Sequence, residues 1–296
     1  TALYTGIVTR LIAARFKRPV LVSLVRAGVP CGVLMRRYAA RMLGRDFLHY
    51  GVSIIRGKGF DENAIHLILR RHPGQEIVFV DGWTGKGMIT TQLEESCRAF
   101  NERNGTALRP TLAVLADPAH CCSLYATRED FINPSCCLNS TICGLISRSV
   151  HNRSIIGPED FHGARVYHEF AAIDQTACYL DTVSSWFSRL DNEISAAARA
   201  LDAPQPPPDW RGMQAVRQIG AAFGIADINR IKPSIGETTR VLLRRVPDRI
   251  LLREPAHPDT EHIRLLAQEK GVPICVYPDM PYLCCGLIAD RREGAV

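Results

Sequence analysis

The stretch Ile77-Val-Phe-Val-Asp-Gly-Trp-Thr-Gly-Lys-Gly-Met-Ile-Thr90 joins an apolar run, an acid and a glycine-rich turn. We predict that residues 76–81 form a buried strand ending at Asp81 and that residues 89–103 form the next helix. In open parallel sheets, ligands bind outside the carboxyl ends of the strands, where backbone amides and helix N-termini face anions. The stretch therefore predicts a strand, a loop and a helix that together hold an anionic group.

The loop of this unit has the composition of a phosphate-binding turn. Its glycines permit positive φ and close backbone approach, its threonine offers a hydroxyl and its lysine adds a positive charge. It is not a Walker loop, because the G-x-x-x-x-G-K-[ST] spacing is absent. The alternative interpretation is a tight connection that binds nothing. The residues expected to hold the phosphate are Asp81, Gly82, Trp83, Thr84, Gly85, Lys86 and Gly87.

Short apolar runs alternate with helical stretches through the first two-thirds of the chain. Strands are predicted at 19–25, 48–55, 76–81 and 111–116, and helices at 31–43, 62–71 and 89–103. Such strands are too apolar to keep one wet face, which is typical of a mainly parallel sheet covered by helices on both sides. The predicted fold class is therefore α/β.

Residues 202–209 contain four prolines and are predicted to be a linker between two domains. We expect residues 1–201 to form the first domain, with an irregular region over 118–170 and a long amphipathic helix over 174–200. Beyond the linker, helices at 211–223, 236–245 and 259–270 and strands at 249–253 and 273–277 predict a small α/β sandwich over residues 210–296.

The charge, the apolar runs and the cysteines of the chain limit the classes of protein to which it can belong. The net charge of +6 does not by itself require a nucleic-acid partner. No run approaches the roughly 20 apolar residues that cross a bilayer, and no signal peptide is evident, so we expect a cytoplasmic protein without a membrane partner. The eleven cysteines lack the paired spacing of zinc sites and are odd in number, so we expect no metal site and no disulfide framework.

Val78-Phe-Val-Asp81 and Thr84-Gly85 resemble the signature of type I phosphoribosyltransferases. Two departures are that Gly82 replaces the usual second acid and that the loop is shorter. The chain more closely resembles a phosphoribosyltransferase-like subgroup found near bacterial tellurite-resistance and stress genes, the StiP family. The phrases that carry this resemblance are Ser23-Leu-Val-Arg-Ala-Gly28, Asp81-Gly-Trp-Thr-Gly-Lys-Gly87 and Gly144-Leu-Ile-Ser-Arg148.

The resemblance implies a type I phosphoribosyltransferase-like fold and a stress-linked enzyme acting at C1 of a phosphorylated ribose. Phosphoribosyl pyrophosphate would be the partner and Mg²⁺ the cofactor. Arg56 and Lys58 would stabilise the departing pyrophosphate, while Asp81 would hold ribose hydroxyls or metal-linked water. The pyrophosphate loop implied in the same way consists of Arg26, Ala27 and Gly28.

The C-terminal residues resemble Pelota-type and kink-turn RNA-binding domains. Residues 237–240 match the Glu-x-Thr-Lys helix start of that family, and Gly271-Val-Pro273 matches the turn before its last strand. The lead-in Ser234-Ile-Gly236 lacks the family's asparagine. The alternative to RNA binding is a solvated basic face on an ordinary small domain. The implied RNA contacts are Lys232, Glu237, Thr239, Arg240 and Arg244.

Two other functions stay open at this point. One is a non-catalytic nucleotide-binding sensor coupled to RNA through the C-terminal domain, which Gly82 in place of an acid favours. The other is a cysteine hydrolase, for which Cys121 and Cys136 are candidate nucleophiles although no local nucleophile signature is present. The sequence is also compatible with a homodimer.

Overall fold

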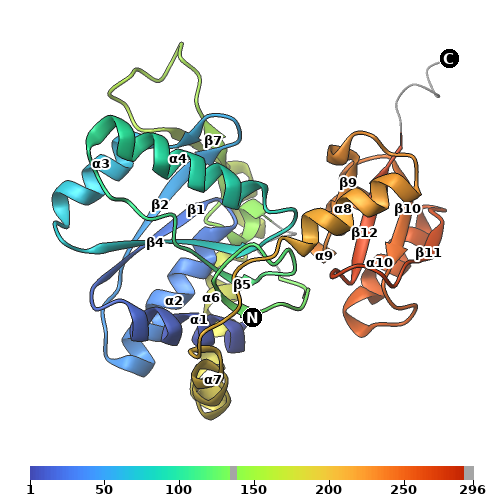
Figure 1. The fold of residues 1–296 in the computed structure, drawn as a ribbon, viewed down its shortest axis with the longest axis horizontal. Helices are drawn as coiled ribbons and strands as arrows, with labels where there is room; N and C mark the ends of the chain where they lie inside the picture. Colours follow the sequence, from blue (N-terminus) through green and yellow to red (C-terminus); the bar gives the residue numbers. More distant parts are fainter. Residues whose placement is uncertain (134–138, 290–296) are drawn as a thin grey trace.

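The computed structural model describes residues 1–133 and 139–289, which form two α/β sheet structures (Figure 1). The α-helices are α1 (Ala2–Arg15), α2 (Gly28–Leu43), α3 (Glu62–Arg71), α4 (Met88–Asn104), α6 (Thr176–Ser185), α7 (Phe187–Leu201), α8 (Arg211–Ala222), α9 (Ile235–Arg244) and α10 (Glu261–Glu269). The strands are β1 (Pro19–Val25), β2 (Leu48–Ile55), β3 (Gly59–Phe60), β4 (Glu76–Trp83), β5 (Leu112–Ala116), β6 (Leu124–Thr127), β7 (Ile146–Val150), β8 (Gly163–Val166), β9 (Ile231–Pro233), β10 (Pro247–Leu252), β11 (Ile274–Val276) and β12 (Cys284–Ile288).

The first sheet has six strands in the order β3-β2-β1-β4-β5-β6. All neighbouring pairs are parallel except β2 and β3, which form an antiparallel pair at the edge. In the register, Val20 of β1 lies between Leu48 of β2 and Ile77 of β4. The parallel arrangement brings the carboxyl ends of β1, β2, β4 and β5 to one edge of the sheet.

Helices cover both faces of this sheet. α1, α2, α6 and α7 pack on one face, and α3 and α4 pack on the other (Figure 1). Because side chains alternate along a strand, Leu21 of β1 joins the first core while Val20 and Val22 join the second. Within the described ranges, no helix has the length and apolar character to cross a membrane.

The second sheet has four strands in the order β11-β10-β12-β9. β10 is parallel to β11 and antiparallel to β12, which is in turn antiparallel to β9. α8 packs on one face through Val216 and Ile219, and α9 and α10 pack on the other through Leu242 and Ile263. This small α/β structure follows the proline-rich residues 202–209, where no helix or strand is present.

The expected fold class, a mostly parallel sheet flanked by helices with a small C-terminal α/β structure, is confirmed. Three details of the prediction are wrong. The helix expected over 174–200 is interrupted at Trp186, where α6 gives way to α7. β4 continues through Trp83 instead of ending at Asp81. The strands β3, β6, β7, β8, β9 and β12 are absent from the prediction, because such short segments carry little sequence pattern.

Side chains at the end of β4 and in the loop after it form hydrogen bonds with residues of the second α/β structure. Lys86 Nζ donates hydrogen bonds to the carbonyl oxygens of Ile228 at 2.5 Å and Ile231 at 3.1 Å. Trp83 Nε1 donates to Ser234 Oγ at 3.0 Å. These bonds fix β9 and the start of α9 against the carboxyl edge of the first sheet.

Asp130 makes a second connection between the two sheets. Its Oδ2 accepts hydrogen bonds from the backbone N–H of Ile235 at 3.1 Å and of Leu283 at 3.2 Å. Ile235 is the first residue of α9, where an acceptor satisfies an otherwise unpaired N–H and suits the helix dipole. Burial raises the pKa of Asp130 to about 7, and the two N–H donors partly offset that rise.

Gly28 is predicted to be required for packing of α2 against β4. A Cβ at this position would lie 2.3 Å from the carbonyl oxygen of Val80, whereas a Cβ at Gly85 would meet nothing within 4 Å. Gly28→Ala should therefore lower the free energy of unfolding by about 1–3 kcal/mol, measured by urea denaturation. Gly85→Ala is the matched control and should change it by less than about 0.5 kcal/mol. Equal effects of the two substitutions would contradict this account.

Asp130 should make stability depend on pH. Its pKa rises from 3.8 to about 7 on folding, so the folded state binds more protons than the unfolded state between these values. The stability contribution of the neutral carboxyl is therefore complete below about pH 4 and is lost as pH rises to about 7. Asp130→Asn keeps an acceptor oxygen without the charge and should flatten this part of a plot of Tm against pH.

The matched variant for that experiment is Asp130→Ala. It leaves both buried N–H groups without their acceptor and should lower the free energy of unfolding by about 2 kcal/mol or more at every pH. Parallel curves of Tm against pH for the natural protein and Asp130→Asn would show that Asp130 does not titrate in this range.

Candidate functional site

A pocket of about 520 Å³ lies at the carboxyl edge of the first sheet. One wall comes from the ends of β1 and β2, the loop after β4 and strand β7. The other wall comes from β9 and α9. Its volume falls in the range of small-ligand sites. The pocket is therefore built by residues on both sides of the proline-rich segment.

The pocket is strongly basic. Among the described lining residues, six cations face two carboxylates, Asp81 and Glu237. The cations are Arg26, Arg56, Lys86, Arg148, Lys232 and Arg240. Such an excess of one charge in a concave site concentrates the opposite charge there. The arrangement suits an anionic ligand.

Asp81 is one of the two carboxylates that line this pocket. Its Oδ1 accepts the N–H of Gly82 at 2.7 Å. Burial raises the pKa of Asp81 to about 7, and the Gly82 N–H and the positive charge of Arg240 only partly oppose that rise. A group with this pKa exists in both protonation states at neutral pH, as proton-transfer groups require.

The cations differ in how they are held. Arg26 Nη1 donates to the carbonyl of Ile146 at 3.0 Å, and burial lowers its pKa, with Arg148 and Arg240 adding to the effect. Arg240 pairs with Glu237 at 2.6 Å and stacks over Trp83, 5.6 Å from the ring centroid. Burial lowers the pKa of Lys86 to about 8, helped by the neighbouring charges of Lys232 and Arg56.

Most of the predicted site residues meet at this pocket. From the loops of the first sheet these are Arg26, Ala27, Arg56, Asp81, Trp83, Thr84, Gly85, Lys86 and Gly87. Lys232, Glu237 and Arg240, predicted to contact RNA, line the same pocket. Arg148 and Ser149 of β7 also line the pocket but were not predicted as site residues, although the phrase Gly144-Leu-Ile-Ser-Arg148 that carries the family resemblance could have indicated Arg148.

Five predicted residues lie elsewhere. Gly28 packs against β4, and Gly82 is buried within β4. Lys58 is exposed outside the pocket. Thr239 is buried and bonds the carbonyl of Ile235 at 2.8 Å, while Arg244 is exposed at the end of α9. None of these five lines the pocket.

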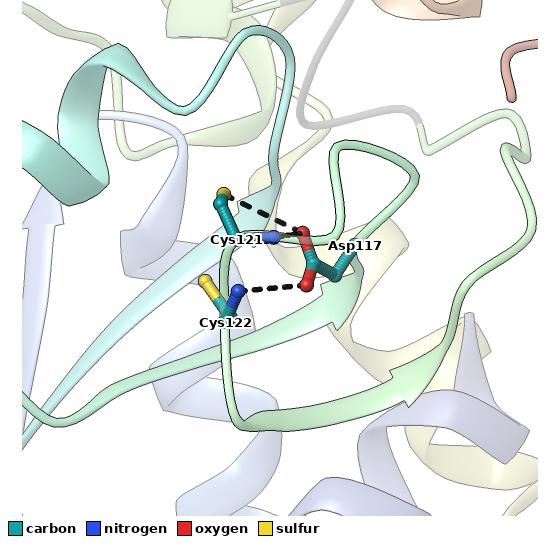
Figure 2. Close-up of side chains that lie close together, drawn as sticks. All are labelled: Asp117, Cys121 and Cys122. Carbon is teal, nitrogen blue, oxygen red and sulfur yellow. Dashed lines mark hydrogen bonds between the residues drawn. The ribbon is translucent and has the colours of Figure 1, made fainter. Parts of the chain in front are cut away.

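Asp117, directly after β5, organises a buried turn beside the pocket (Figure 2). Its Oδ1 accepts the N–H of Cys121 at 3.1 Å and the thiol of Cys121 at 3.5 Å, and its Oδ2 accepts the N–H of Cys122 at 2.8 Å. Thr84, a pocket residue, donates to Oδ1 at 2.5 Å, and Arg128 forms an ion pair with Oδ2. The turn is thus bonded to the pocket wall.

Ligand atoms of Asp117, Cys121 and Cys122 lie within 4.8 Å of one another, close enough to hold a metal ion. The five donors already on Asp117 exceed the roughly four lone-pair positions of a carboxylate. Arg128 also places a positive charge there. The cluster therefore suits a hydrogen-bonded turn better than a cation.

Cys121 has polar neighbours on several sides. Its Sγ lies 3.2 Å from the Oγ1 of Thr90, another pocket residue. His120, the preceding residue, places Nδ1 3.7 Å from a carboxylate oxygen of Asp209. Burial is the main cause that lowers the pKa of His120, which favours a neutral imidazole. Cys136, the other candidate nucleophile, lies outside the described residues.

The pocket offers little to a magnesium ion. Mg²⁺ requires carboxylate or other oxygen ligands, and the two lining carboxylates lie among six cations, with Glu237 already paired to Arg240. These residues do not fit the ion, and the expected Mg²⁺ cofactor stays a prediction.

Comparison with known families gives two matches. Residues 1–184 match the family model "Tellurite-like stress resistance cysteine protease StiP". Residues 210–290 match the "PELOTA RNA binding domain" model. A curated relative, "Cysteine protease StiP" from Acinetobacter baylyi (strain ATCC 33305 / BD413 / ADP1), is 40% identical over 294 residues, covering 96% of this chain and 76% of the relative.

A solved structure, a hypoxanthine-guanine-xanthine phosphoribosyltransferase, matches 45% of this chain and 77% of its own at 14% identity, with a TM-score of 0.26. A likeness this weak carries no functional argument.

These comparisons correct the functional prediction. The expected phosphoribosyltransferase activity is wrong, and with it phosphoribosyl pyrophosphate as partner, because the matching family and the relative are both described as cysteine proteases. They agree with the alternative of a cysteine hydrolase. The similarity to tellurite-resistance and stress proteins is confirmed. The chain belongs to the StiP family.

Proposed function

We propose that this protein is a cysteine hydrolase that cleaves peptide bonds and that Cys121 is its nucleophile. Family membership supports the class of reaction. The observation that carries the assignment of the residue is the hydrogen bond from the Cys121 thiol to the Asp117 carboxylate at 3.5 Å. A nucleophilic thiol needs neighbouring groups that orient it and receive its proton, and Asp117 lies at hydrogen-bond distance from this thiol.

Six of the other described cysteines are less suited. Burial raises the pKa of several thiols and keeps them protonated at neutral pH; the values are about 12 for Cys97, Cys143 and Cys285. The Cys122 thiol also has a raised pKa, chiefly through its hydrogen bond with Cys121. Cys31 and Cys284 lie in apolar cores. The nine described cysteines are not in disulfides, which suits the cytoplasm expected from the sequence.

The proposed reaction follows from the neighbours of Cys121. The sulfur attacks the carbonyl carbon of the scissile bond, and the thiol gives up its proton, which is destined for the leaving amine. The carbon–nitrogen bond then breaks, the leaving amine takes that proton, and water hydrolyses the resulting thioester. His120, neutral and next to Asp209, is the second group that can carry a proton in the water step.

Cys121→Ala is expected to lower kcat by at least about a thousandfold, because loss of a nucleophile removes the covalent step. Hydrolysis of a fluorogenic peptide mixture measures this effect. Cys178→Ala is the matched control, since Cys178 is exposed on α6 and away from the pocket, and should keep full activity.

Alkylation with iodoacetamide provides an independent readout. Cys121 is only 3% exposed, so its labelling should be slower than that of Cys178, and activity should fall in step with the slower reaction. Full activity in Cys121→Ala together with loss in Cys136→Ala would move the nucleophile to Cys136. Activity in both variants after complete alkylation would exclude a cysteine hydrolase.

RNA binding by the C-terminal residues is a second function that we propose. Its support is the family match over 210–290 and the exposed pair Arg244 and Arg245 at the end of α9. Lys232, Glu237 and Arg240 face the pocket instead. Arg244, a predicted RNA contact, and its neighbour Arg245 are therefore the exposed cations of this helix end best placed for phosphate contact.

Substituting Arg244 and Arg245 together by alanine should weaken binding of a labelled single-stranded RNA about tenfold. It should also reduce the slope of log K against log salt by about 1.4, the value for two lost phosphate contacts. The control is the corresponding exposed pair Arg70 and Arg71 at the end of α3, whose substitution should leave binding unchanged. Equal loss in both double variants would indicate a nonspecific charge effect.

A further inference from the structure

Two cations of the basic pocket stand on opposite walls without a counter-charge. Arg148 of β7 and Lys232 of β9 both line the pocket. Across the described ranges, neither side chain forms a hydrogen bond or an ion pair. The nearby Arg26 is held by a neutral carbonyl, and its pKa is lowered in part by the charges of Arg148 and Arg240. Positive charges on both walls thus face the same space, and an anion there would offset their mutual repulsion.

The two carboxylates of the pocket do not neutralise this charge. Glu237 is bonded to Arg240, and Asp81 accepts the N–H of Gly82. Asp81 and Glu237 together can balance at most two of the six lining cations. An additional ligand with two or more negative charges would fit the remaining excess.

The pocket and the proposed nucleophile share a wall. Thr84 lines the pocket and donates to Asp117 at 2.5 Å. Thr90 lines the pocket and lies 3.2 Å from Cys121 Sγ. A chain segment lying in the pocket would therefore run beside the Cys121 turn. With a volume of about 520 Å³, the pocket can take a short extended segment but no folded domain.

We propose that this pocket binds acidic side chains of a peptide substrate, with Arg148 on one wall and Lys232 and Arg240 on the other contacting its carboxylates. The identification of the ligand as a peptide rests on the proposed hydrolase function. The charge preference rests on the pocket alone. The natural substrate is accordingly a segment with two or more aspartate or glutamate residues near the cleaved bond.

Binding is tested in the full chain carrying Cys121→Ala, so that the peptide stays intact. Fluorescence anisotropy compares a labelled peptide containing Asp-Glu-Asp with the same peptide containing Asn-Gln-Asn. The acidic peptide should bind at least about tenfold more tightly, because hydrogen bonds to charged groups are the strong ones. Arg148→Gln and Lys232→Gln should each weaken its binding about tenfold. Lys58→Gln, exposed and outside the pocket, should not.

The outcomes separate the two proposals. Equal affinity for the acidic and amide peptides would overturn the acidic preference while leaving the hydrolase intact. Acidic binding that depends on Arg148 and Lys232, without cleavage by the natural protein, would support the pocket and overturn the hydrolase. A third outcome is that neither peptide binds, whereas a short RNA binds tightly and loses its binding in Arg148→Gln and Lys232→Gln. This outcome would assign the pocket to nucleic acid and overturn the inference.

Discussion

The position of the C-terminal residues depends on the hydrogen bonds that Lys86 donates to the carbonyl oxygens of Ile228 and Ile231. Lys86 sits between the end of β4 and the start of α4, so its backbone is held by the two main elements of the first sheet. Tyr282 adds a bond in the opposite direction, from its hydroxyl to the carbonyl of Gly85 at 2.7 Å. Without this docking, the basic pocket would have one wall.

The parallel sheet explains why the pocket and the thiol lie together. Arg26 follows β1, Asp81 lies near the end of β4, and Asp117 follows β5. Because the carboxyl ends of parallel strands meet at one edge, three segments far apart in sequence contribute to a single region. The anion-binding charge and the proposed nucleophile therefore belong to one functional edge, linked through Thr84 and Thr90.

The long strands β1, β2 and β4 and most helices could be predicted from the sequence, because continuous apolar runs such as 76–81 are typical of buried strands. The location of a site after β4 followed from the same pattern. The role of Lys86 could not be predicted in this way, since a lysine in a loop shows its charge but not the carbonyls that it contacts. Arg240 lies in a helix start resembling an RNA-contact motif, and only the packing of α9 places it in the pocket.

The reaction was harder to predict than the fold. Resemblance of the loop at 81–87 to a phosphate-binding signature favoured the wrong enzyme class. Cys121 has no local signature, because Asp117, which accepts a hydrogen bond from its thiol, acquires that position through the turn after β5 and its bonds to Thr84 and Arg128. Such chemistry depends on tertiary neighbours.

The central claim is that an acidic peptide lies next to Cys121, in the pocket formed by the first sheet together with β9 and α9. This claim can be tested with one reactive probe. An acidic peptide ending in a chloromethyl ketone would be incubated with the natural protein, and the alkylated residue identified by peptide mapping with mass spectrometry. The account predicts a single modification at Cys121, at a rate that falls about tenfold in Arg148→Gln. Modification of another cysteine, or of Cys121 at equal rates by acidic and neutral probes, would contradict it.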